Sequence, residues 1–344
     1  MNAIHKMCLR AAALAVLIAG CTAASHMKAL QPAAPAKSPP LQVPVVRPAV
    51  QLGVDIDAYT YPGQDVAKAA QQDIAYIASL HANAVLISFP FFMDGPDSVN
   101  VHATAATPTP AQLAVIVRYA AEAGLYVAIR PLLDEASLGA VRTRWLPADE
   151  HAWFARYRAF LLPYAAMAEA DHVQEFIVGA EFSRFAHSRY WDPLDAALRR
   201  AYAGTLAFAN NWGGTFLAGA GGSVAETVDA YHPLSAPLLA AWEAFDRALP
   251  AGTVETEVGI AAVSGGYRAP FRSSWPARVL DPAMQATWFS AACHAALATH
   301  LGGIYFWAIG LGNLGGPTLA DQGAWAHSVG AAAIAQCFAQ EVPS

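Results

Sequence analysis

Short apolar runs alternate along the chain with longer segments in which apolar residues recur every three or four positions. That helical period is clear at Val66, Ala70, Ile74 and Ile77, which would share one face of a helix. The short runs have the length and composition of buried strands, and from residue 51 onward they predict eight of them. The predicted strands are residues 51–55, 84–89, 126–131, 173–179, 215–218, 228–232, 254–258 and 303–307.

This alternation of strand and helix is typical of βαβ units in a parallel sheet. Three dipeptides, Thr109-Pro110, Asp192-Pro193 and Asp281-Pro282, each place a capping side chain before a proline and therefore predict helix starts. No Gly-rich nucleotide-binding turn follows the first predicted strand. Eight such units favour the α/β class and a closed (β/α)8 TIM barrel, formed as a single domain by residues 50–340, over an open doubly wound sheet.

The predicted connections from strand to helix are long, at residues 90–109, 132–151, 259–281 and 308–322, whereas those from helix to strand are short. In a barrel the long loops gather at the carboxyl ends of the strands, where active sites of this fold lie. Residues at the strand ends are therefore the candidates for function. They are Asp55, Asp57, Arg130, Asp134, Glu181, Asn211, Tyr231, His232, Glu257 and Trp307.

Glu181 and Glu257 stand out because each ends an otherwise buried strand, where an unpaired carboxylate is costly unless it has a partner or a task. Eight strands about 4.8 Å apart and tilted by about 36° form a ring of roughly 7.7 Å radius. Strands four and seven then stand about 14 Å apart, and two inward glutamates leave about 5 Å between their carboxyl groups. That separation is typical of glycoside hydrolysis with retention of configuration.

Five stretches carry a more specific resemblance: VGAEF at 178–182, FANNW at 208–212, DAYHPL at 229–234, TEVG at 256–259 and GIYFW at 303–307. They are similar to the strand ends of glycoside hydrolase family 113, which contains retaining β-mannanases of the (β/α)8 clan, and the similarity runs from about residue 52 to residue 338. The resemblance implies that Glu181 is the acid/base and Glu257 the nucleophile. It also implies that Tyr231 donates a hydrogen bond near the nucleophile and that Trp307 forms a sugar platform.

The sequence departs from the family pattern at two places. Ala180 stands where many members of the clan carry Asn, so a donor to the sugar 2-hydroxyl must come from elsewhere. The basic, proline-containing stretch near the last helix is replaced by LADQG at 319–323, which affects the distant subsites. The loops that would select mannose over glucose or xylose align least well.

Structural roles are alternatives for several candidates. Glu181 would be a structural carboxylate if it paired with Arg130 or Arg184, and Glu255 would replace Glu257 as the nucleophile if the strand register differed, because side chains two apart share a face. Trp307 is otherwise a core aromatic, His232 a structural histidine, and Asp55, Asp57 and Asp134 loop caps. We expect Asn211, Trp212, Asp57 and Arg130 to bind substrate with Tyr231 and Trp307, and Trp145, Trp212 and Trp275 to offer stacking surfaces.

The amino-terminal segment has the features of an export signal. Lys6 and Arg10 precede an apolar stretch that is too short to span a bilayer, and IAGC at 18–21 resembles a lipobox. We therefore expect a lipoprotein signal peptide at residues 1–20, lipidation of Cys21 and an Ala- and Pro-rich tether at 21–49. The alternative is an ordinary signal peptide with Cys21 incidental. Either interpretation exports the protein, and the lipid would anchor it to the bacterial cell envelope, at the outer membrane or facing the periplasm. In an oxidising compartment Cys293 and Cys337 are free to pair or to stay as buried thiols.

Composition excludes other functions. Of the 344 residues 56% are hydrophobic and 13% charged, the net charge is −6, and no basic run appears, so nucleic-acid binding is not expected. His-x-His on the first strand, helical His-Glu-x-x-His and Gly-x-Ser-x-Gly are all absent, so we expect no metal, no cofactor and no serine nucleophile. The sequence predicts a retaining glycoside hydrolase for a β-linked, mannan-like polysaccharide or oligosaccharide, or for another polymer such as a modified exopolysaccharide. The alternative is a non-catalytic polysaccharide-binding lipoprotein of the same fold that serves export or assembly of a surface polymer.

Overall fold

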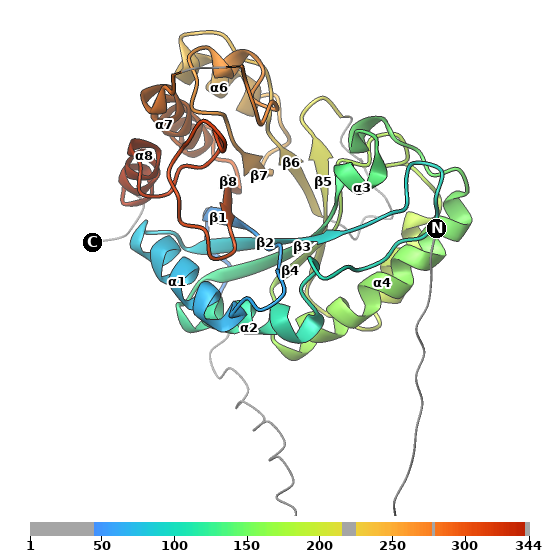
Figure 1. The fold of residues 1–344 in the computed structure, drawn as a ribbon. Helices are drawn as coiled ribbons and strands as arrows, with labels where there is room; N and C mark the ends of the chain where they lie inside the picture. The colour runs from blue at the N-terminus through green and yellow to red at the C-terminus, as the bar shows by residue number, and fades with distance from the viewer. Residues whose placement is uncertain (1–44, 215–224, 277–278, 341–344) are drawn as a thin grey trace, which may run out of the picture. The chain divides into compact units, whose positions relative to one another are not determined.

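A computed structural model describes residues 45–214, 225–276 and 279–340 of the chain. Within them, eight parallel strands pair in sequence order and the first pairs with the last, which closes a barrel (Figure 1). The strands are β1 (Gln51–Asp57), β2 (Ala84–Phe91), β3 (Tyr126–Leu133), β4 (Glu175–Ala180), β5 (Thr205–Asn211), β6 (Ala225–Asp229), β7 (Val254–Val258) and β8 (Gly303–Gly310). The predicted (β/α)8 fold is confirmed.

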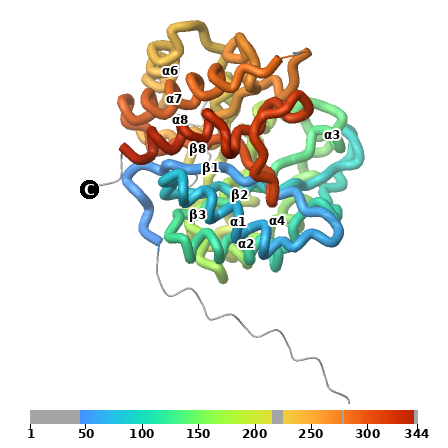
Figure 2. Tube along the Cα trace, turned by 60° about the vertical axis from the view of Figure 1, so that its left-hand side comes forward, coloured from blue at the N-terminus to red at the C-terminus, as the bar shows by residue number. Residues whose placement is uncertain are grey.

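Helices connect the strands and surround the barrel, and Figure 2 shows α7 and α8 side by side beside β8 and β1. The helices are α1 (Val66–Ser79), α2 (Pro110–Glu122), α3 (Glu135–Leu138), α4 (Glu150–Ala170), α5 (Trp191–Leu198), α6 (Leu238–Asp246), α7 (Pro282–Ala298) and α8 (Val329–Phe338). Two 3-10 turns, η1 (Arg142–Arg144) and η2 (Gly266–Arg268), lie in the loops after β3 and β7. Both loops are on the face where the sequence predicts the site.

Two of the three predicted helix starts are confirmed. Thr109 caps α2, and Asp281 caps α7 by accepting from the backbone N–H of Met284. The third is wrong, because α5 begins at Trp191 and Asp192 therefore lies inside its first turn. Trp191 is buried and its indole N–H donates to the carbonyl of Phe185, so tertiary packing sets the start of α5 ahead of the Asp-Pro signal.

The sequence placed the fifth strand wrongly, and the sixth strand, predicted at 228–232, is found three residues earlier. The predicted strand at 215–218 lies outside the described residues, and the structure places the fifth strand at Thr205–Asn211. Ala207 and Ala209 face the barrel interior, where space is limited and small side chains suffice. This strand therefore lacks the bulky β-branched residues by which strands are normally predicted.

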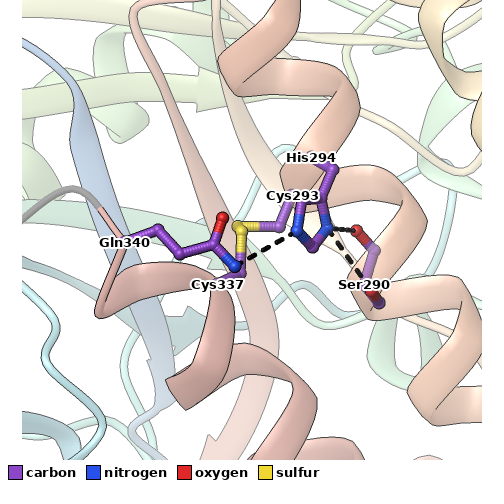
Figure 3. The surroundings of a disulfide bond; sticks show 5 residues. All are labelled: Ser290, Cys293, His294, Cys337 and Gln340. Carbon is purple, nitrogen blue, oxygen red and sulfur yellow. Dashed lines mark hydrogen bonds between the residues drawn. A yellow bond between two sulfur atoms is a disulfide. The ribbon is translucent and has the colours of Figure 1, made fainter.

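A disulfide joins the last two helices of the barrel. Cys293 of α7 is bonded to Cys337 of α8, with the Cα atoms 6.4 Å apart. Figure 3 shows the bond beside His294, whose Nδ1 contacts Ser290 and whose Nε2 lies 3.5 Å from Nε2 of Gln340. Of the two possibilities left open by the sequence, the paired form is the one found.

Two further findings apply to the described part of the chain alone. Its helices are all too short or too polar to cross a membrane. Its His, Cys, Asp and Glu side chains form no group of three or more that is arranged to hold a metal ion.

Candidate active site

Glu181 and Glu257 line one cavity at the carboxyl ends of the strands. The cavity has a volume of about 610 Å³, and the two glutamates are 8% and 3% exposed. Four residues that we expected to bind substrate also line it: Asn211, Trp212, Tyr231 and Trp307. The barrel thus brings together residues from β4 to β8 that are far apart in the sequence.

The carboxylate of Glu181 is held from two sides. Nδ2 of Asn211, the last residue of β5, donates to Oε1 over 2.7 Å, and Nη2 of Arg142 in η1 donates to Oε2 over 2.9 Å. Arg142 is itself anchored, because its Nη1 donates to the carbonyl of Leu133 over 2.8 Å. With a hydrogen bond accepted by each oxygen, the arrangement matches the ionised form of a carboxylate.

The backbone at Glu181 is strained. Its φ of 59° lies in the left-handed region, which a residue with a Cβ rarely adopts. Two backbone hydrogen bonds hold this conformation: the N–H of Glu181 donates to Ala209, and its carbonyl accepts from Ser183. Strain of about 1 kcal/mol or more persists when the surroundings fix it and is common at functional sites. Here the left-handed residue directly follows β4, at the point where its side chain enters the cavity.

A β-bulge in β7 directs Glu257 into the same cavity. Asp229 of β6 pairs with Glu257, whereas the residue before it pairs with Glu255, so Thr256 is the extra residue of the bulge. Thr256 donates to Asp229 inside the barrel, while Glu255 is fully buried against Asp246 of α6 outside it. The expectation that Glu255 shares a face with Glu257 is therefore wrong, and Glu255 is not an alternative nucleophile.

Arg130, which we expected to contact substrate, is fully buried and does not line the cavity. Its Nη2 lies 2.6 Å from Oε1 of Glu257 and 2.7 Å from Oδ2 of Asp55, and its Nη1 lies 3.0 Å from Oδ1 of Asp229. Burial, to which the charge of Glu257 adds, raises the pKa of Asp55 and of Asp229 well above the usual range. Arg130 acts in the opposite direction on the pKa of both aspartates, and all three carboxyl groups surround its guanidinium.

The charge state of Glu257 reflects several opposing influences. Burial raises the pKa of its carboxyl group above the usual range, and the neighbouring charge of Glu181 raises it further. Arg130, Arg142 and a hydrogen bond from Tyr231 act in the opposite direction. Gly259 makes room for that tyrosine, since a Cβ at Gly259 would lie 3.2 Å from Cε1 of Tyr231.

A second cavity of about 340 Å³ adjoins the first. The two share Ser273, Trp307 and Gly323, so Trp307 is half-buried between them and is available to both. Asp57 lines the second cavity and not the first. Burial, with the charge of Glu257 as the next cause, raises the pKa of Asp57 to about 7.

Several expected residues have structural roles instead. Trp145 is buried among aromatic rings and donates to the carbonyl of Pro96, so it offers no stacking surface. Asp134 caps α3 and accepts from Tyr59, as a loop cap does. His232 lies between the rings of Trp212 and Phe245, and burial lowers its pKa. Trp275 is half-buried, carries Arg272 on its ring and does not line the first cavity.

Two site residues were missed by sequence reasoning. Asp229 ends β6 and pairs with Arg130, so its position at a strand end was a signal that could have found it. Arg142 lies within the long loop after β3, and no local pattern indicates that it reaches Glu181. The cation that pairs with Glu181 is therefore neither Arg130 nor Arg184, the two partners that the sequence had suggested.

Comparisons with known proteins place the chain in a family. No curated protein sequence matches it. The solved structure of a GH113 β-1,4-mannanase has a TM-score of 0.70 and 16% identity, covering 85% of this chain and 99% of that one. The GH113 β-mannanase AaManA from Alicyclobacillus acidocaldarius, in complex with ManMIm, has a TM-score of 0.70 and 19% identity, covering 85% and 98%.

A GH5_18 protein from Streptomyces cattleya, in complex with Manβ1-4GlcNAc, is more distant, with a TM-score of 0.57 and 16% identity, covering 86% of this chain and 82% of that one. At these identities the structural likeness shows the barrel fold alone. The sequence model of Glycoside Hydrolase Family 113 matches residues 58–309, which is well over half of the 344 residues. The chain therefore belongs to glycoside hydrolase family 113.

Proposed function

We propose that this glycoside hydrolase cleaves a β-linked, mannan-like polysaccharide or oligosaccharide with retention of configuration. Glu257 is the nucleophile and Glu181 the acid/base. The observation that carries the proposal is that these two carboxyl groups, from β7 and the end of β4, line one cavity with Tyr231 and Trp307. Two structural neighbours are β-mannanases, which supports a mannan-like substrate.

The environment of Glu257 suits attack on an anomeric carbon. The guanidinium of Arg130 lies 2.6 Å from Oε1, and Tyr231 donates a hydrogen bond, so the ionised form is stabilised although the group is almost fully buried. Both contacts fix the orientation of the carboxylate, and orientation is a large part of the rate gain in such reactions. In the first step Glu257 bonds to the anomeric carbon as the glycosidic C–O bond breaks.

Glu181 has two tasks in this scheme. In the first step it gives a proton to the leaving oxygen, and in the second it removes a proton from the water that resolves the glycosyl-enzyme. Its contacts with Arg142 and Asn211 match the ionised form that the second step requires. The first step requires the protonated form, in which one oxygen donates its proton to the glycosidic oxygen while each oxygen keeps a lone pair for its present contact.

The test is hydrolysis of β-1,4-mannan, xylan, β-glucan and native exopolysaccharide, with proton NMR of the first product formed. We expect activity on mannan and a β-anomer as the initial product, lost in Glu181→Gln and Glu257→Gln but kept in the surface control Glu243→Gln. An initial α-anomer would contradict retention. Binding of the polymers without any hydrolysis would favour a polysaccharide-binding lipoprotein instead.

We also propose that the protein is exported and anchored by a lipid on Cys21, which lies outside the described residues. The disulfide between Cys293 and Cys337 supports an oxidising compartment. Cys21→Ser is expected to move the protein from the membrane fraction to the soluble fraction. Unchanged membrane association would contradict the lipid anchor.

A further inference from the structure

Two arginines in the wall of the active-site cavity have no carboxylate partner among the described residues. Arg144 comes from η1 in the loop after β3, and Arg272 from the loop after β7, so they reach the same cavity from different parts of the barrel rim. Both side chains are exposed. Arg272 lies over the ring of Trp275, with its Cζ 5.1 Å from the ring centroid, a contact that leaves the edge of the guanidinium free to bind an anion.

The other charged groups of the cavity wall already have partners. Arg142 contacts Glu181 at 2.9 Å and Glu135 at 3.9 Å, and Glu257 contacts the buried Arg130 at 2.6 Å. These ion pairs account for all three glutamates that line the cavity. The positive charges of Arg144 and Arg272 are therefore left for a ligand.

The same wall offers apolar surfaces. Phe271 is 56% exposed and lies beside Arg272 in sequence, and Trp212 is half-buried in the cavity. The C–H face of a sugar ring packs on an aromatic ring without needing a charge, whereas a guanidinium matches the planar geometry of a carboxylate. Aromatic rings beside free guanidinium groups together fit a sugar that carries a carboxylate.

We propose that this cavity binds a β-linked glycan with uronate residues, whose carboxylate pairs with Arg144 or Arg272 while its ring packs on Trp212 or Phe271. The inference rests on the proposed function, because it assigns the substrate class of the same site. The second cavity is lined by Asp57 and Asp321 and by no arginine or lysine. The uronate sugar of the glycan is therefore placed in the first cavity.

The test compares two probes that differ only at C6 of each sugar: the β-1,4-linked hexamer of mannuronate and the β-1,4-linked hexamer of mannose. Binding to the full chain carrying Glu257→Gln, which prevents turnover, is measured by calorimetry at low ionic strength. We expect about tenfold tighter binding of the mannuronate hexamer, which is about 1.4 kcal/mol. Adding Arg144→Ala and Arg272→Ala should remove this preference and leave the affinity for the mannose hexamer within about twofold.

The matched control is Arg268→Ala. Arg268 is an exposed arginine of the same loop as Arg272, stacks on Tyr267 and does not line the cavity, so its removal should leave the preference intact. Equal affinity for the two hexamers, or an equal loss in the Arg268→Ala protein, would overturn the inference.

Hydrolysis of both hexamers by the unsubstituted chain separates this inference from the proposed function. Hydrolysis of the mannose hexamer without any binding preference for mannuronate would overturn the uronate site alone. A preference that depends on Arg144 and Arg272, with hydrolysis of neither hexamer, would support the uronate site and overturn the proposed function.

Discussion

Arg142 and Glu181 lie 39 residues apart in the sequence, and Nη2 of Arg142 donates to Oε2 of Glu181 over 2.9 Å. The arginine comes from a loop and the glutamate from the end of β4, so the bond joins two parts of the barrel rim. The carbonyl of Leu133 holds the other end of the guanidinium. Arg142 is therefore a positioning residue for the acid/base.

Arg142→Ala should lower kcat by about 10- to 100-fold, because a hydrogen bond to a charged group contributes about 1.5–3 kcal/mol. KM should change less, since the lost contact is to Glu181 and not to substrate. Arg142→Lys should recover part of the loss by restoring the charge without the planar fork. Steady-state kinetics would contradict this role if kcat were unchanged or if the effect appeared in KM alone.

Tyr231→Phe should move the acidic limb of the kcat/KM profile to higher pH. The nucleophile has to be ionised, and the hydrogen bond from Tyr231 lowers the pKa of Glu257. Without that bond the pKa of Glu257 rises, so activity is lost at a higher pH as the solution is acidified. The measurement is kcat/KM from pH 4 to 9 for both proteins, and an acidic limb that stays in place or moves down would count against the assignment.

Glu255 and Asp246 form a buried carboxyl pair between β7 and α6 that makes stability depend on pH. Two carboxyl groups share a hydrogen bond only when one of them carries a proton. Burial raises the pKa of Asp246 to about 7 and that of Glu255 well above its usual range. The folded state therefore keeps a proton that the unfolded state loses above about pH 4.

The stabilisation from this proton is fully present below about pH 4 and declines as the pH rises toward 7, by about 1.4 kcal/mol per pH unit for one proton. Asp246→Asn combined with Glu255→Gln removes both titrating groups. Relative to the unsubstituted chain, the double variant should gain stability steadily from pH 5 to pH 7 in urea unfolding. Parallel stability curves for the two proteins would rule out this explanation.

Loss of the disulfide between α7 and α8 should destabilise the barrel. The bond closes a loop with a sequence separation of 44 residues, for which chain entropy predicts a contribution of about 4 kcal/mol. The double variant Cys293→Ala and Cys337→Ala should have a free energy of unfolding that is lower by roughly that amount. Reduction of the disulfide in the unsubstituted chain should lower the free energy of unfolding to a similar extent. An unchanged unfolding midpoint after reduction would contradict the prediction.

The sequence predicted what depends on local pattern. The predicted strands at 173–179 and 254–258 placed Glu181 and Glu257 at strand ends, and the order of strands and helices favoured a closed barrel. These features depend on residues close together in the chain, so their periodicity carries the information.

The remaining features depend on contacts between distant segments. The bulge at Thr256 appears only in the pairing of β6 with β7, and it reverses the expected direction of Glu255. Arg130 lies near the end of the predicted strand at 126–131, as a substrate-binding residue would, yet three carboxyl groups from other strands hold it below the cavity. Arg142 reaches Glu181 through the fold of a loop, which no periodicity encodes.

The most direct test of the central claim is azide rescue of two variants acting on an aryl β-mannooligosaccharide. In Glu257→Ala, azide should take the place of the nucleophile and give the α-glycosyl azide, whereas in Glu181→Ala it should attack the glycosyl-enzyme and give the β-glycosyl azide. NMR of the products distinguishes the two anomers. The opposite pattern, or full activity without azide in either variant, would contradict the assignment of Glu257 as nucleophile and Glu181 as acid/base.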